Sequence, residues 1–144
     1  MYQLNYHSIS RPGLGLEDFD NILEEAIAVN STRNITGCLI YHNHRFIQIL
    51  EGRKKDVLHV YGKIGGDKRH HTVTLLWENH VERRSFEEWN MAFHRPDYEN
   101  VKHFVNNVTL LSEFSEKTSG SLLSFWTTVG EILRSGTTDH LAKV

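Results

Sequence analysis

The pattern of apolar and polar positions predicts that this chain begins with a strand and a helix. Residues 2–8 alternate, with Tyr2, Leu4 and Tyr6 on one face, and this two-residue period is typical of a strand. Residues 16–29 instead carry apolar side chains at intervals of three and four, with acidic residues in the first turn. We therefore expect a strand followed by an amphipathic helix.

A hairpin and a second helix are predicted next. Two apolar runs, residues 37–41 and 46–50, are separated by a short polar stretch. Asn43 lies in that stretch and tolerates a positive φ, which favours a tight antiparallel hairpin. Apolar positions between residues 57 and 64 then follow helical spacing, and the two glycines after them are typical of a helix end.

Two further strands complete the predicted fold. One covers residues 72–78, and a second alternating run carries Trp89, Met91 and Phe93, which we expect on one face. The order β-α-β-β-α-β-β corresponds to a ferredoxin-like sandwich with one added strand. The sequence thus predicts an α+β fold, in which a mixed sheet carries both helices on one face.

The C-terminal third is expected to be helical. Residues 101–108 indicate a short helix, and residues 122–133 form a wide apolar stripe around Trp126. Such helices would cover the free face of the sheet or a partner subunit, so we expect a homo-oligomer. We divide the chain into a domain at residues 1–95 and a helical extension at residues 96–144.

The composition argues against several classes of partner. The chain has 144 residues, with 16 basic and 18 acidic side chains and no long run of either sign. It therefore lacks the electrostatic signature of a protein that binds nucleic acid or an anionic membrane. We find neither a signal-peptide pattern nor an apolar run of spanning length, and expect a cytoplasmic protein. The single cysteine, Cys38, is expected to be a buried core residue.

The sequence offers little evidence for metal binding or catalysis. The chain has ten histidines, but their spacing matches no metal-ligand motif, so we expect no metal site. His7 and Ser8 are neighbours on a strand and point to opposite faces, so they cannot act as a base and its nucleophile. No pair of carboxylates stands out either. We therefore expect a protein that is not an enzyme.

Three polar residues on apolar faces are the candidates for ligand binding. Gln48 lies between apolar residues on a strand and shares a face with Phe46, Tyr6 shares a face with Leu4, and Asn30 ends the first helix. Each alone could be a core polar group satisfied within the protein. Together they indicate a slot between the helices and the sheet, where amides and a phenol could bind the polar edge of a flat heterocycle.

The chain resembles the BLUF family, the blue-light sensors that use flavin. The resemblance spans about residues 1–95 and rests on five blocks in family order. The blocks are Leu4-Asn-Tyr-His-Ser8, Asn30 with Asn34-Ile-Thr-Gly37, Phe46-Ile-Gln-Ile-Leu-Glu-Gly52, Asp67-Lys-Arg-His70 and Arg83-Arg-Ser-Phe-Glu-Glu-Trp-Asn-Met91. One departure lies before the second hairpin strand, where His44 replaces the glycine usual in the family and makes the turn geometry an open question.

The resemblance implies a noncovalently bound flavin, FMN or FAD, between the two helices. Asn30 would bond the N3 and C4=O edge of the ring, and Gln48 would reach N5 and O4. Tyr6 would bond Gln48 and donate an electron to the excited flavin. Arg69 and His70 would line the pyrimidine side or the phosphate end.

A signalling role follows from the same resemblance. Trp89 and Met91 would form the switching pair that relays the change at Gln48, and the output would pass to a downstream signalling protein. The short C-terminal extension makes the chain similar to stand-alone sensors of this family. From the residues alone, a flavin-free ferredoxin-like ligand-binding module or a small hydrolase is the alternative.

Overall fold

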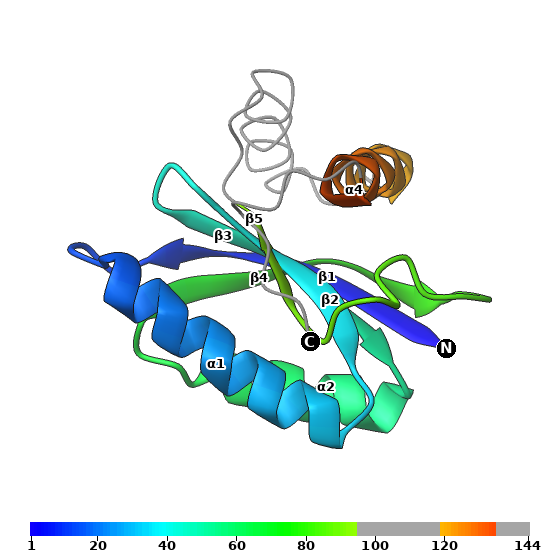
Figure 1. Cartoon of the computed structure of the whole chain (residues 1–144), viewed down its shortest axis with the longest axis horizontal. Helices are drawn as coiled ribbons and strands as arrows, with labels where there is room; N and C mark the ends of the chain where they lie inside the picture. The colour runs from blue at the N-terminus through cyan, green and yellow to red at the C-terminus, as the bar shows by residue number, and fades with distance from the viewer. Residues whose placement is uncertain (95–118, 135–144) are drawn as a thin grey trace.

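The fold is a five-stranded sheet with helices on both faces (Figure 1). The computed structural model describes residues 1–94 and 119–134. In chain order the elements are β1 (Tyr2–Ser10), α1 (Leu16–Thr32), β2 (Thr36–His42), β3 (Arg45–Gly52), α2 (Lys54–Gly65), β4 (His70–His80), β5 (Ala92–His94) and α4 (Ser119–Arg134). The predicted order of strands and helices is confirmed.

The sheet is mixed, with the strand order β4-β1-β3-β2-β5. β1 pairs antiparallel with both β3 and β4, and β2 pairs antiparallel with β3. Only the pair of β2 and β5 is parallel. β1 and β3 therefore occupy the middle of the sheet, where Tyr6 lies directly opposite Gln48.

The hairpin between β2 and β3 turns on two residues with positive φ. Asn43 has φ of 52° and His44 has φ of 61°. Two successive positive φ values give the turn the twist that antiparallel strands require. His44 thus adopts a left-handed backbone, which costs about 1 kcal/mol for a residue with a Cβ.

α1 and α2 cover one face of the sheet. Phe19 of α1 and Val57 and Val60 of α2 pack on a core that includes Leu4 and Leu50. α1 begins at Gly15, whose backbone N–H donates to a carboxylate in the first turn. α2 ends as predicted, but the glycine that follows it keeps a right-handed conformation, so no left-handed cap is formed there.

α4 covers the opposite face. Its buried residues Trp126, Val129 and Leu133 pack on strand residues that include Ile40 and Ile47. The prediction that a C-terminal helix covers this face is confirmed for α4, whereas the helix expected at residues 101–108 lies outside the described residues. Cys38 is fully buried in the same layer, and its burial raises the pKa of the thiol. Among the described residues, no helix is long and apolar enough to cross a membrane.

The segment before β5 differs from the prediction. We expected Trp89, Met91 and Phe93 on one face, but the strand begins only at Ala92. Trp89 packs in the core layer under α4, whereas Met91 packs in the layer under α1 and α2. The reason is a turn in which the Trp89 N–H donates to the carbonyl of Phe86, so that the alternation of a strand does not apply there.

Candidate functional site

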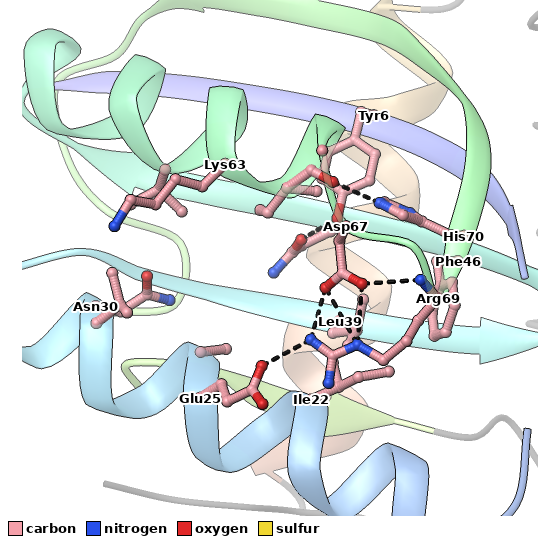
Figure 2. Close-up of a pocket in the computed structure, with 16 residues that line it drawn as sticks. Tyr6, Ile22, Glu25, Asn30, Leu39, Phe46, Lys63, Asp67, Arg69 and His70 are labelled. Carbon is pink, nitrogen blue, oxygen red and sulfur yellow. Dashed lines mark hydrogen bonds and ion pairs between the residues drawn. The ribbon is translucent and has the colours of Figure 1, made fainter.

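A pocket lies between α1, α2 and the face of the sheet that these two helices cover (Figure 2). Its volume is about 310 Å³. The lining residues come from both helices, from strands β1, β2, β3 and β4 and from the loop between α2 and β4. They are Tyr6, Ile22, Glu25, Ala26, Val29, Asn30, Leu39, Phe46, Gln48, Val60, Lys63, Ile64, Gly66, Asp67, Arg69 and His70. All five residues that the sequence predicted for cofactor binding are among them.

A chain of three side chains crosses the inner wall of the pocket. The Tyr6 hydroxyl donates to Oε1 of Gln48, and Nε2 of Gln48 donates to Sδ of Met91 at 3.3 Å. All three side chains are almost fully buried. The register of β1 and β3 puts Tyr6 and Gln48 opposite each other, and the segment before β5 brings Met91 to the same place. A thioether is a weak acceptor, so the Gln48 amide nitrogen is only weakly satisfied.

The Tyr6 phenol is held in its protonated form. Burial raises its pKa, and the neighbouring Tyr61 and Asp67 raise it further. The Tyr61 ring lies 5.5 Å from the Tyr6 ring, between centroids. At neutral pH the Tyr6 hydroxyl therefore keeps its proton, which it donates to Oε1 of Gln48 in this structure.

Asn30 leaves one acceptor unused. Its Nδ2 donates to the backbone carbonyl of Asn90 at 2.9 Å, which anchors the side chain at the end of α1. Its Oδ1 is buried and has no hydrogen-bond partner. An unsatisfied buried acceptor costs about 1–3 kcal/mol, and a ligand N–H would recover that energy.

Three charged side chains form a bridge across the pocket. Nη2 of Arg69 donates to Asp67 at 2.6 Å and to Glu25 of α1 at 2.7 Å, as Figure 2 shows. Hydrogen bonds from Arg69 lower the pKa of the Asp67 carboxyl. The bridge therefore ties α1 to the loop after α2. Sequence reasoning missed Glu25, Asp67 and Lys63, although Asp67 opens one of the family-like blocks.

His70 is fixed from two sides. Its Nδ1 lies 2.6 Å from the Ser8 hydroxyl, and its Nε2 lies 2.6 Å from the backbone carbonyl of Ile64. Because a carbonyl can only accept, Nε2 carries a proton, and Nδ1 accepts from Ser8 in the neutral ring. His70 thus links β4 to β1 and to the end of α2, beside the pocket.

Trp89 does not line this pocket. It packs with Phe86 and Trp126 under α4, at ring-centroid distances of 6.2 Å from Phe86 to Trp89 and 5.7 Å from Phe86 to Trp126. Trp89 and Met91 therefore lie on opposite sides of the sheet, although they are two residues apart. Of this predicted pair, only Met91 contacts Gln48.

Comparison with known proteins identifies the family. The family model described as "BLUF: Sensors of blue-light using FAD" matches residues 1–92. The alpha subunit of photoactivated adenylate cyclase from Euglena gracilis is 36% identical over 83 residues, or 58% of this chain. The blue light- and temperature-regulated antirepressor BluF of Escherichia coli is 31% identical over 68 residues, or 44% of this chain. The match spans 8% of the cyclase subunit and 17% of the antirepressor.

Solved structures agree with this assignment. The photo-activated state of BlsA aligns with a TM-score of 0.77 and 26% identity, covering 90% of this chain and 94% of that one. A bacterial light-regulated adenylyl cyclase aligns with a TM-score of 0.73 and 29% identity, over 78% of this chain and 35% of its own. The family match, the fold and the pocket together place this chain in the BLUF family of flavin-binding blue-light sensors.

Proposed function

We propose that the flavin of this blue-light sensor lies in the pocket between α1 and α2, with Asn30, Gln48 and Tyr6 as the polar groups at its ring. The observation that carries the proposal is the unused Oδ1 of Asn30, a buried acceptor beside a pocket of about 310 Å³. That volume lies in the range typical of small-molecule sites. The ring N3–H of a flavin is the kind of donor that this acceptor lacks.

The rest of the pocket also fits a flat heterocycle with a polar tail. Six of its sixteen lining residues are aliphatic, with Ile22, Val29 and Leu39 among them, and suit the faces of a fused ring. Arg69, which belongs to the charged bridge, and the neighbouring His70 would line the pyrimidine side or the phosphate end. FMN and FAD have the same ring, so the residues that contact it do not distinguish the two cofactors.

The chain's own chemistry centres on Tyr6. A bound flavin would supply a chromophore for blue light that can accept an electron when excited. Tyr6 is the buried phenol that would donate this electron, and its hydroxyl proton would move along the hydrogen bond to Oε1 of Gln48. When the electron returns, the proton returns too, so the cycle consumes nothing.

Gln48 is the group that changes its partners. An amide presents an oxygen on one side and an N–H2 on the other, so rotation by a half turn exchanges acceptor and donor. In this structure the nitrogen faces Met91, a weak acceptor, and the rotated amide would direct it elsewhere. Two settings of similar free energy make a bistable element, which a switch requires.

The output passes to another protein in this proposal. Residues 1–95 form the sensor and residues 96–144 the helical extension, with Trp89 and Met91 relaying the change. Enzyme activity in the cyclases belongs to longer proteins, of which the match spans 8% in the Euglena gracilis alpha subunit and 35% in the bacterial enzyme, and we propose a sensor that is not itself an enzyme. The partner is a downstream signalling protein, and the sensor acts as a homo-oligomer in the cytoplasm.

Absorption spectra of the purified full chain test the proposal. We expect a yellow protein whose flavin bands shift to longer wavelength under blue light and recover in the dark. Colourless protein that ignores added FAD and FMN would overturn it and favour a flavin-free ligand-binding module. A yellow protein with no light-induced shift would support flavin binding in the pocket but contradict the switch at Gln48.

A further inference from the structure

A second buried polar group lies on β3, on the face opposite Gln48. Glu51 is fully buried, and its carboxylate accepts four hydrogen bonds. Oε1 accepts from Nε2 of Gln3 at 3.0 Å and from the Ser85 N–H at 2.6 Å. Oε2 accepts from the Thr36 hydroxyl at 3.0 Å and from the Phe86 N–H at 3.1 Å. Every donor in this set is directed at a negatively charged oxygen.

Two of these donors belong to the connection between β4 and β5. The backbone N–H groups of Ser85 and Phe86 have no strand partner there, and the carboxylate satisfies both. Burying a carboxylate is costly unless it accepts hydrogen bonds. The two N–H groups therefore stabilise the buried Glu51 carboxylate, and the carboxylate in turn holds the connection in place. Arg84 adds to the attachment, because its guanidinium donates to Thr36 at 2.8 Å and to the Glu51 carbonyl at 3.1 Å.

The anchored connection leads directly to the switch. After Phe86 the chain turns, and the Trp89 carbonyl accepts from the Gly37 N–H of β2 at 3.1 Å. Two residues later, Met91 contacts the Gln48 amide. Residues 84–91 are therefore fixed to the sheet at one end by Glu51 and touch the moving amide at the other.

The same residues also hold α4. Arg134 donates to the backbone carbonyl of Ser85 and to Glu88 at 3.0 Å, and its guanidinium lies 5.7 Å from the centre of the Trp89 ring. Phe86 packs edge-on against Trp126 of α4. The segment thus lies between the Gln48 side of the sheet and α4, with contacts to both.

We propose that Glu51 is the positioning residue of this light response: its carboxylate anchors residues 84–91, so that a change at Gln48 and Met91 is transmitted to α4. The inference rests on the proposed function of Gln48. With the segment anchored at Ser85 and Phe86, displacement of Met91 must move Trp89 and the side chains packed on it. Without the anchor, the connection would absorb the displacement.

Hydrogen exchange in the dark and under blue light tests this role in the full-length, flavin-loaded protein. In Glu51→Gln the side chain keeps its size, but its amide nitrogen cannot accept, so two of the four donors lose their partner. We expect exchange at Ser85 and Phe86 to become at least about tenfold faster in the dark, which corresponds to the loss of about 1.4 kcal/mol. We expect the flavin red shift to persist and the light-induced change in exchange of residues 126–134 to disappear.

Glu87→Gln is the matched control, because Glu87 is exposed in the same connection. It should keep the red shift and the light-induced change in α4. A Glu51→Gln protein that also keeps the change in α4 would overturn the role of Glu51. Absence of a red shift in the wild-type protein would instead contradict the proposed function, so the two failures are distinguishable.

A second variant keeps the test decisive if Glu51→Gln does not fold. Thr36→Val has nearly the same shape and removes only the hydroxyl that donates to Oε2. We expect faster exchange at Phe86 and a smaller light-induced change in α4, with the red shift retained. An unchanged response of α4 in this variant would contradict the anchor.

Discussion

Gln48 and Glu51 are buried polar side chains three residues apart on β3, and they face opposite sides of the sheet. Gln48 has one strong partner, the Tyr6 hydroxyl, and one weak partner, the Met91 sulfur. Glu51 has four donors around two oxygens. One strand therefore carries an amide with one weak partner and a carboxylate that accepts from four donors.

The difference follows from the chemistry of the two side chains. A carboxylate can only accept, so surrounding it with donors leaves one stable arrangement. An amide has an acceptor and a donor that exchange places on rotation, and a weak partner at one end leaves room for a second arrangement. A sensor needs both kinds of group, because a movable side chain transmits a signal only when its surroundings do not move with it.

The largest expected effect is the loss of the light response in Gln48→Ala. Removing the amide removes the group that changes partners, so the red shift of flavin absorption should vanish although flavin still binds. Gln3→Ala is the matched control, since Gln3 is also buried but lies on the Glu51 side. A full red shift in Gln48→Ala would remove Gln48 from the mechanism.

Tyr6→Phe should also abolish the photocycle, through a different cause. The phenyl ring keeps the packing but has no hydroxyl to share with Gln48 and is a far poorer electron donor. Transient absorption should show flavin excitation that decays without a red-shifted product. Tyr61→Phe, which alters the ring 5.5 Å away, should retain the cycle. An intact cycle in Tyr6→Phe would contradict its role.

Substitution of Glu51 should change the stability of the protein rather than its flavin absorption. Glu51→Ala removes the shared acceptor of four donors, and we expect the free energy of unfolding to fall by about 3 kcal/mol or more. Urea denaturation measures this change. Glu87→Ala, at an exposed position of the same connection, should change it by less than about 0.5 kcal/mol. Equal losses of stability in Glu51→Ala and Glu87→Ala would contradict the stabilising role of the Glu51 carboxylate.

Substitution of Asn30 tests the proposed contact between its Oδ1 and the flavin ring. Asn30→Ala removes the unused Oδ1 acceptor, and we expect flavin affinity to fall about tenfold, or about 1.4 kcal/mol. Titration of the flavin-free protein measures the affinity. Asn21→Ala, on an exposed position of the same helix, should bind as the wild type does. Unchanged affinity in Asn30→Ala would exclude this contact.

The smallest expected effect is a pH dependence caused by Tyr6. Burial raises the pKa of Tyr6 in the folded protein, while the unfolded chain ionises near its ordinary value of about 10. The unfolded state therefore binds fewer protons above that pH, and stability falls as the pH rises. Between pH 10 and 11 we expect the wild type to lose about 1 kcal/mol more than Tyr6→Phe in denaturant titrations. Parallel pH profiles would contradict the assignment.

Most of the fold was predictable because its signals are local. The alternation around Tyr6 and Gln48 and the helical spacing around Phe19 each depend on a few neighbouring residues. The prediction failed at Trp89 and Met91, where the alternation continued through a turn. A hydrogen bond from Trp89 to Phe86 decided the conformation there, and no period in the sequence records it.

Five of the residues that line the pocket could be predicted, and so could the contact of Tyr6 with Gln48, but the charged contacts could not. Tyr6, Asn30 and Gln48 stood out because polar groups on apolar positions require partners. The bridge from Arg69 to Glu25 could not be predicted, because it joins residues 44 positions apart through the packing of α1 against the loop after α2. Nothing in the sequence indicated that Glu51 is buried, because it lies near the end of an apolar strand, where a solvent-exposed carboxylate is common.

The sequence by itself determined the order of strands and helices along the chain, the faces of the helices and the family, because periodicity and short motifs are properties of neighbouring residues. Tertiary structure alone decided which way Trp89 and Met91 face, which acceptor Asn30 leaves unused and which donors meet Glu51. The physical reason is that a hydrogen bond depends on distance and direction in space. Gln48 and Glu51 are both polar residues in the same strand, and only the folded chain gives one a weak partner and the other four donors.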